Sequence, residues 1–184
     1  MKKRSFYVTV CWIVFSRSFD AYCTNLQTPD LQKEANPLVS SLGLTWSPLL
    51  LILGLLLIYV IYAFYQAVFH PIKLNPTEKG WSFQEFVTFR YLGKKAHWTS
   101  LLFQFPSTPK RFHQVMGPLF ATCLSFAGII STVMWILIFN SSWYRSVHHA
   151  GLIYGLLISG CLYICYASFR KNYSIYVSIP NERT

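Results

Sequence analysis

A stretch of 22 residues without a charged side chain, from Pro48 to Phe69, constrains the fold of this chain more than any other feature. At about 1.5 Å per residue, a helix of this length is roughly 33 Å long, which is enough to cross a hydrocarbon core of about 30 Å. A helix of a water-soluble protein would normally show a polar stripe or be shorter. The stretch therefore predicts a membrane-spanning helix.

Two further uncharged stretches, residues 115–139 and 151–169, follow the first one. Charged residues make up only 12% of the chain, whereas a soluble domain has about 25%. We therefore expect an all-α integral membrane protein whose membrane domain, residues 48–169, contains three transmembrane helices.

The N-terminal residues 1–23 have the three parts of a secretory signal peptide. A positive start, Lys2–Arg4, precedes an apolar run, Ser5–Phe15, and Ala21–Cys23 is a small-x-small sequence at which cleavage could occur. The same pattern is typical of an uncleaved signal-anchor or interfacial helix, which is the alternative. A mitochondrial presequence would be Arg-rich and amphipathic, and this stretch is mostly apolar.

The loop between the first two spans, residues 70–112, is expected to contain a short amphipathic helix. Ser82 followed three residues later by Glu85 is a capping box, and Gly93 is a suitable end for the helix. Apolar side chains recur at helical spacing and predict one apolar face: Phe83, Phe86, Val87 and Tyr91. We expect this helix either to lie in the membrane interface or to pack on a partner's cytosolic domain.

The distribution of the net charge of +10 predicts the orientation. Most of the basic residues outside the N-terminal segment lie in the loop 70–112 and the tail 170–184, so the positive-inside rule places both in the cytosol. Residues 24–47, a polar segment, are then outside the cytosol, as a signal peptide would also leave them. Several basic residues are expected to contact anionic lipid headgroups: Lys94, Lys95, Lys110, Arg111, Arg170 and Lys171.

Small residues at four-residue spacing mark one face of the second and third spans. Such residues allow helix backbones to approach closely, and packing then drives helix association in lipid. The residues expected to form helix contacts are Gly117, Ala121 and Ser125 in the second span and Gly151, Gly155 and Ser159 in the third. The partner helix could belong to this chain or to another subunit.

No pattern of catalytic or metal-binding residues stands out. The three spans contain no Asp, Glu, Lys or Arg, which argues against an ion pump or a proton-coupled transporter. The five cysteines give no C-x-x-C pair, so we expect neither a zinc site nor a disulfide framework. A nucleic-acid partner is not expected either, because no basic stripe lies on a soluble domain.

Histidines offer one weak cofactor candidate. His70 and His113 end their spans on the same side of the membrane, and paired axial histidines can hold b-type haem between helices. At the end of a span, however, a histidine is usually an interfacial polar residue. We therefore predict no cofactor.

The sequence thus favours a non-catalytic accessory, assembly or scaffolding subunit of a larger membrane complex in the secretory pathway or plasma membrane. Its expected partners are other integral membrane subunits and anionic lipids. Two alternatives remain: a redox anchor that binds haem through His70 and His113, and a lipid-handling enzyme that uses loop residues such as His97.

Overall fold

The computed structural model describes residues 3–31 and 37–178, and within them the only regular elements are helices. Three of these helices are long and apolar enough to cross a membrane: α3 (Trp46–Phe69), α6 (Pro109–Asn140) and α8 (Ala150–Ser178). The prediction of an all-helical chain with three candidate spans is confirmed.

The long helices extend beyond the predicted spans, α3 only at its start, where it begins at Trp46 rather than Pro48, and α6 and α8 by more. α6 begins at Pro109 rather than Val115, because the Thr108 hydroxyl accepts a hydrogen bond from the backbone N–H of Arg111 and proline suits the first helical position. α8 continues to Ser178 rather than ending at Phe169, since its last turns pack against the loop between α3 and α6.

The N-terminal segment forms the fourth long helix, α1 (Lys3–Gln27). α1 is not among the three candidate spans, yet it packs along α6 and also contacts α3. Phe6 and Ile13 are buried there with Phe64 and Ala121 in one apolar cluster. Residues 3–23, which the sequence assigns to a signal-like segment, thus supply part of the core of the helical bundle.

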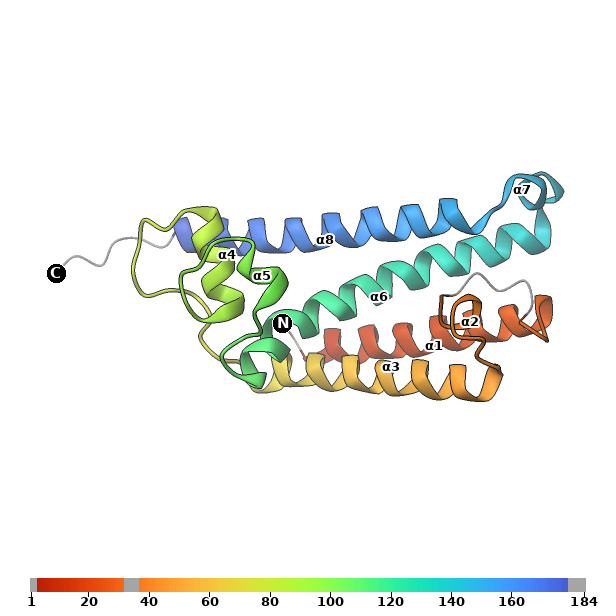
Figure 1. The fold of residues 1–184 in the computed structure, drawn as a ribbon, viewed down its shortest axis with the longest axis horizontal. Coiled ribbons are helices and arrows are strands. Elements are labelled where there is room, and N and C mark those ends of the chain that lie inside the picture. Colours follow the sequence, from red (N-terminus) through yellow and green to blue (C-terminus); the bar gives the residue numbers. More distant parts are fainter. Residues whose placement is uncertain (1–2, 32–36, 179–184) are drawn as a thin grey trace.

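The four long helices run in alternating directions along one axis (Figure 1). α6 lies between the others and contacts α1, α3 and α8. The start of α6 and the ends of α3 and α8 lie at the same end of the bundle as the segment 70–108. We call this the loop end.

Four shorter helices connect the long ones. α4 (Phe83–Leu92) and α5 (Ser100–Phe103) lie at the loop end, while α2 (Pro37–Ser40) and α7 (Ser142–Val147) lie at the opposite end. α7 forms the connection between α6 and α8. Within the tail 170–184, residues 170–178 are the end of α8, and Arg183 lies outside the described residues.

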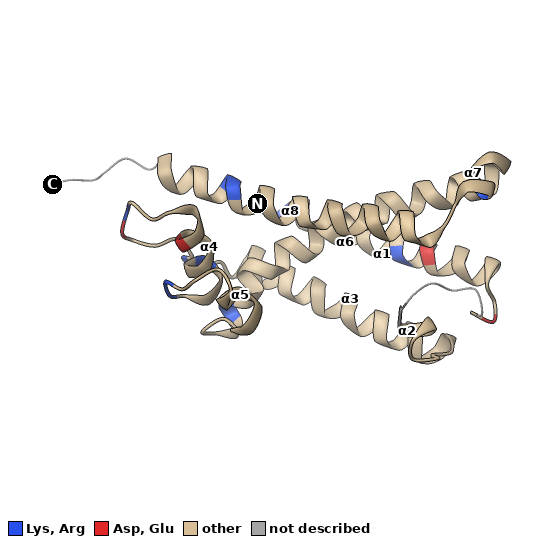
Figure 2. Ribbon diagram, turned by 45° about the horizontal axis from the view of Figure 1, so that its top comes forward, with Lys and Arg blue, Asp and Glu red and all other residues tan. Residues whose placement is uncertain are grey.

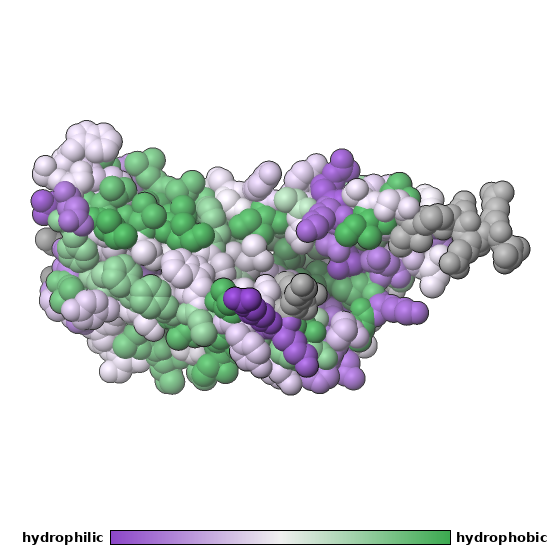
Figure 3. All heavy atoms as spheres, turned by 180° about the vertical axis from the view of Figure 1, so that it is seen from behind, coloured by the Kyte–Doolittle hydropathy of each residue, from purple (hydrophilic) through white to green (hydrophobic). Residues whose placement is uncertain are grey.

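The surface of the bundle divides along its length. Apolar side chains cover much of the outside of the long helices, and polar residues gather toward the loop end (Figure 3). Leu51, Ile58 and Leu162 are among the exposed apolar side chains, each more than three-fifths exposed. Basic residues are concentrated around α4, α5 and the connections beside them (Figure 2). This pattern matches a bundle in lipid with one charged end.

Candidate functional site

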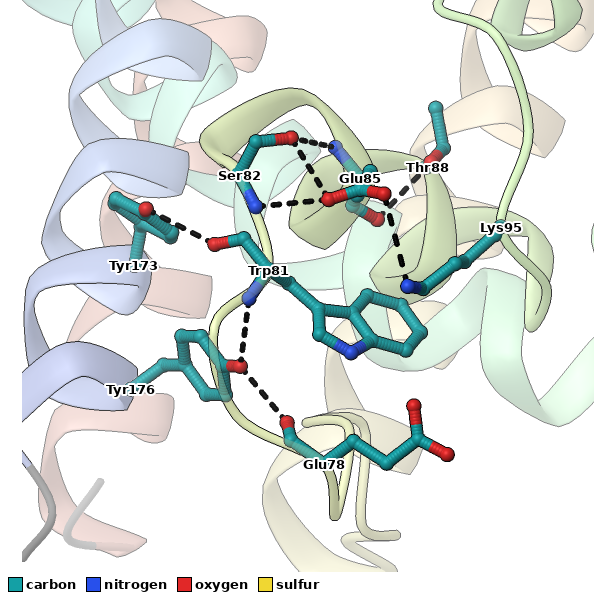
Figure 4. Close-up of polar contacts among 8 residues, drawn as sticks. All are labelled: Glu78, Trp81, Ser82, Glu85, Thr88, Lys95, Tyr173 and Tyr176. Atoms are coloured by element: carbon teal, nitrogen blue, oxygen red, sulfur yellow. Dashed lines mark hydrogen bonds and ion pairs between the residues drawn. The ribbon is translucent and has the colours of Figure 1, made fainter.

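At the loop end, α4 is docked on the last turns of α8 through two tyrosines (Figure 4). The Tyr176 hydroxyl donates to the carbonyl of Glu78 at 2.8 Å and accepts from the N–H of Trp81 at 3.4 Å. The Tyr173 hydroxyl donates to the carbonyl of Trp81 at 3.1 Å. Phe86 is fully buried, and its ring packs against the rings of both tyrosines. The segment before α4 is therefore fixed to α8 by both polar and aromatic contacts.

The predicted capping box of α4 is confirmed. The backbone N–H of Ser82 donates to the Glu85 carboxylate at 2.9 Å, and the N–H of Glu85 donates to the Ser82 hydroxyl at 3.3 Å. Lys95 forms an ion pair with Glu85 at 3.6 Å and lies over the ring of Trp81. The hydrogen bonds from Ser82, and then Lys95, hold the pKa of Glu85 below its ordinary value. Gly93 ends the helix with a φ of 89°, a conformation that favours glycine.

The apolar residues predicted on α4 contact other helices of the same chain, and they are buried to different degrees. The surface that contains Phe86 is covered by Tyr173 and Tyr176 of α8, while Phe83 contacts Tyr173 and Tyr166 at the edge of the contact. Val87 packs beside Phe86, and Tyr91 packs against the cluster of Leu74, Val115 and Leu119. Thr88, between these residues in the sequence, is also fully buried.

Gln114, a buried polar residue near the start of α6, connects α6 to the end of α3. Its side-chain amide donates to the carbonyls of Gln66 and His70 at 2.8 and 2.9 Å, and its oxygen accepts from the N–H of Ile72 at 3.4 Å. All three bonds end on backbone groups where α3 stops. The Gln66 carbonyl also accepts from the backbone N–H of His70, so Gln114 adds a second donor there. The bonds to His70 and Ile72 fix the first residues of the loop.

Arg111 fixes α4 to the start of α6. Its guanidinium donates to the carbonyls of Phe89 and Arg90 at 2.6 and 3.1 Å, at the C-terminal end of α4. A cation at this position also complements the partial negative charge of the helix end. Gln114 and Arg111 lie one turn apart on α6, so this turn holds both sides of the loop.

Beside these contacts, α5 exposes an apolar segment at the loop end. Leu102, Phe103 and Phe105 are 71%, 82% and 86% exposed, and Trp98 is 54% exposed. This segment, rather than the buried side of α4, is the exposed apolar surface of the loop.

The small residues predicted on the second span lie against different helices of the chain. A Cβ at Gly117 would lie 2.8 Å from the backbone nitrogen of Phe64 and closer still to the carbonyl of Ala63, so α6 and α3 are nearly in backbone contact there. Ala121 is buried in the cluster with Phe6. The backbone carbonyl of Ser125 accepts from the indole N–H of Trp12 on α1 at 3.1 Å.

The small residues predicted on the third span are all exposed, in contrast. At Gly155 an added Cβ would meet no atom within 4 Å, and at Gly151 it would meet only the neighbouring His149. Ser159 is exposed as well. The close contact between α6 and α8 forms instead at Gly160, against the ring of Phe126.

The predicted lipid-contacting cations divide into two groups. Lys95 and Arg111 are engaged by the contacts described above. Lys94, Lys110 and Lys171 are exposed, and Arg170 is exposed with its guanidinium 5.2 Å from the ring centre of Phe83.

The candidate haem ligands contact different aromatic rings. His70 lies against Tyr65, and His113 lies between Tyr59, Tyr62 and Phe112. Among the described residues no group of three or more His, Cys, Asp or Glu side chains is arranged to hold a metal ion. The imidazole of His97 lies 3.0 Å from the Thr99 hydroxyl at the exposed start of α5.

A polar cluster lies between α1 and α6 that was not predicted from the sequence. Arg17 donates to the Ser131 hydroxyl at 2.7 Å and pairs with Asp20 at 3.4 Å, and the indole N–H of Trp135 donates to Asp20 at 2.8 Å. One turn before Ser131 on α6, Gly128 lies against Ser16 of α1. The spacing of Arg17 and Asp20 (i, i+3) was visible in the sequence, but only the packing of α1 on α6 shows that they are partly buried.

Comparison of the chain with protein-family models, with curated proteins and with solved structures finds no match.

Proposed function

We propose that this protein is a non-catalytic, multi-pass accessory or scaffolding subunit of a larger membrane complex. The observation that supports this function best is the exposed face of α8 that contains Gly151, Gly155 and Ser159. Gly117, Gly128 and Gly160 each lie in a close helix contact within the chain, whereas the face at Gly155 is uncovered.

A face of this kind suits a second helix better than lipid alone. Lipid tails are as apolar as leucine, so helices in a membrane associate through close packing rather than through a hydrophobic drive. α8 packs on α6 and α4 with its other side, which leaves the small-residue face available. The proposed partner is a transmembrane helix of another integral membrane subunit.

The loop end is proposed to face the cytosol, because that end has most of the basic residues in the loop and tail. The opposite end, with α2 and α7, then lies outside the cytosol, in the secretory pathway or at the cell surface. Tags placed after Lys94 and after Thr184 should both be accessible to protease only from the cytosolic side. Opposite accessibility of the two tags would contradict the arrangement.

We also infer that residues 1–23 remain in the mature protein as a signal-anchor helix. Cleavage after Cys23 would remove Phe6 and Ile13 from the core and Ser16 from its contact with Gly128. Intact mass of the protein extracted from membranes should therefore include these residues. A mature chain that begins at Thr24 would contradict this proposal.

Replacement of Gly155 tests the subunit function. Gly155→Leu should reduce the fraction of protein in the complex, because a leucine there separates the two helices, and overpacking of this kind costs about 1–3 kcal/mol. The measurement is the amount of complex on a native gel after mild detergent extraction from cells with normal expression.

The matched control is Gly54→Leu. Gly54 is on α3, and a Cβ there also meets no atom within 4 Å, so the same substitution is made at another open site. Gly54→Leu should assemble as the wild type does. If Gly155→Leu also assembles as the wild type does, the proposed contact on α8 is wrong.

A further inference from the structure

A groove of about 730 Å³ lies at the loop end. Toward this end α6 diverges from α8 (Figure 1). Its walls come from α3, α4, α6 and α8 and from the chain between Ile72 and Thr77. Its apolar lining includes Val115 and Leu119, which are buried, and Phe169, which is partly buried. Its polar lining, which we call the rim, includes Lys73, Arg90 and Asn172. The groove is thus apolar toward the spans and cationic toward the loop.

Arg90 gives the rim a positive charge that the described residues do not neutralise. Its guanidinium donates to the side-chain oxygen of Asn75 at 2.7 Å, and no ion pair joins it to a described carboxylate. The charged group whose electrostatic effect lowers its pKa is another cation, Arg111. Burial, and then Arg111, lower the pKa of Arg90 to about 10, so it is still protonated at neutral pH.

A partly buried cation beside a second cation is unfavourable unless an anion pairs with it. Phosphate oxygens match a guanidinium well, because two N–H groups can donate to them in parallel. Lys73, exposed on the same rim, adds a second positive charge. The charges therefore favour a ligand with a phosphate group.

The apolar part of the groove restricts the ligand further. It begins where α3 ends and α6 enters its apolar stretch, which is the level at which lipid headgroups meet acyl chains. A free phosphate ion would leave Val115, Leu119 and Phe169 uncovered. A phospholipid would place its phosphate at the rim and an acyl chain along these side chains.

We propose that this groove binds one anionic phospholipid, with its phosphate against Arg90 and Lys73 and an acyl chain against Val115, Leu119 and Phe169. Neither Lys73 nor Arg90 was among the lipid-contacting residues expected from the sequence. The proposal goes beyond the subunit function and does not depend on it, because the groove lies at the other end of α8 from Gly151.

Native mass spectrometry of the full chain in detergent tests the proposal. The probes are phosphatidylglycerol, phosphatidylcholine with the same acyl chains, and inorganic phosphate. We expect one tightly bound phosphatidylglycerol, which also raises the thermal unfolding temperature, and little effect from phosphatidylcholine. If inorganic phosphate produces the same rise and phosphatidylglycerol adds nothing to it, the site is for a small anion and the lipid proposal is overturned.

Three variants locate the bound lipid. Lys73→Gln should weaken phosphatidylglycerol binding about fivefold, because each basic group near a headgroup contributes about that factor. Arg90→Gln should weaken it roughly tenfold or more, since it removes charged hydrogen bonds. Lys79→Gln, which changes another exposed lysine of the same loop outside the groove, should leave binding unchanged.

Lys73→Gln keeps the experiment interpretable if Arg90→Gln disturbs the loop, since the Lys73 side chain is exposed. Equal binding by the wild type and Lys73→Gln, or equal losses in Lys73→Gln and Lys79→Gln, would overturn the assignment of the site. Assembly of the complex in Gly155→Leu is a separate readout, so failure of one proposal does not imply failure of the other.

Discussion

Gly117→Ala should destabilise the bundle although it adds only one methyl group. At this position α6 lies against the backbone of α3, and a Cβ would lie 2.5 Å from the carbonyl carbon of Ala63 and 2.8 Å from the nitrogen of Phe64. Backbone atoms cannot rotate away as the tip of a side chain can. The two helices must therefore separate locally to make room.

The required movement sets the size of the effect. Carbon atoms attract best at about 3.5–4.0 Å, so the helices have to move apart by roughly 1 Å. A gap of this size already loses a quarter to a half of the attraction between the atoms that line it. We expect a loss of about 1–3 kcal/mol in the free energy of unfolding, in the range typical of overpacked cores. The gain of about 1 kcal/mol in helix propensity from glycine to alanine would offset part of this loss.

The free energy of unfolding can be measured by titrating the protein from mild detergent into SDS and following helicity. Gly54→Ala is the control, because it makes the same change on α3 where no atom lies within 4 Å of the added methyl. This control should be neutral or slightly stabilising. If Gly117→Ala is as stable as the wild type, or if both variants lose the same free energy, the close contact of α3 and α6 is refuted.

Two further predictions concern charged groups. The pKa of Glu85 is held below its ordinary value of 4.5, first by the backbone N–H and hydroxyl of Ser82 and then by Lys95. A lowered folded-state pKa means that the carboxylate favours the folded loop above the unfolded value and loses this effect as the pH falls through the folded value. Protection of the α4 amides in hydrogen exchange, corrected for intrinsic rates, should therefore decrease in acid. The variant Glu85→Gln should show low protection already at neutral pH. Unchanged protection in Glu85→Gln would contradict the role of the capping box. Asp20→Ala should lower the free energy of unfolding by about 1.5–3 kcal/mol, because it leaves the indole N–H of Trp135 without its acceptor and Arg17 without its counter-charge. In SDS titration the double variant Arg17→Leu with Asp20→Ala should lose less than the sum of the two single losses, and additive losses would show that the residues do not act together.

The spans were the part of the fold that the sequence predicted best. α3, α6 and α8 each contain a long uncharged run, and burial in lipid requires little else of a helix. The ends of the helices were harder to predict. Thr108 and Pro109 are a recognisable helix start, whereas the extension of α8 past Arg170 depends on Tyr173 and Tyr176, whose contact with the loop only the three-dimensional structure shows.

The position of α1 could not be read from local sequence. Arg17 and Asp20 make its C-terminal half too polar for a predicted span, and their partners are on α6. The same limit applies to the small residues. Spacing identifies Gly117 and Gly155 equally, but only the packing shows that one lies against α3 and the other faces outward. The groove at Arg90 joins residues of four helices and one loop segment, so no local pattern could have indicated it.

The contacts between α1 and α6 also determine how long α1 waits for its partners during synthesis. Arg17 and Ser131 are 114 positions apart in the chain, and Asp20 and Trp135 are 115 apart. At about 5–20 residues per second, a ribosome needs on the order of ten seconds to make the intervening segment. Throughout that interval the guanidinium and the carboxylate of α1 have each other but not their partners on α6. The polar groups of the first helix therefore remain without their partners until α6 has been made, and α8 is the last long helix to join the bundle.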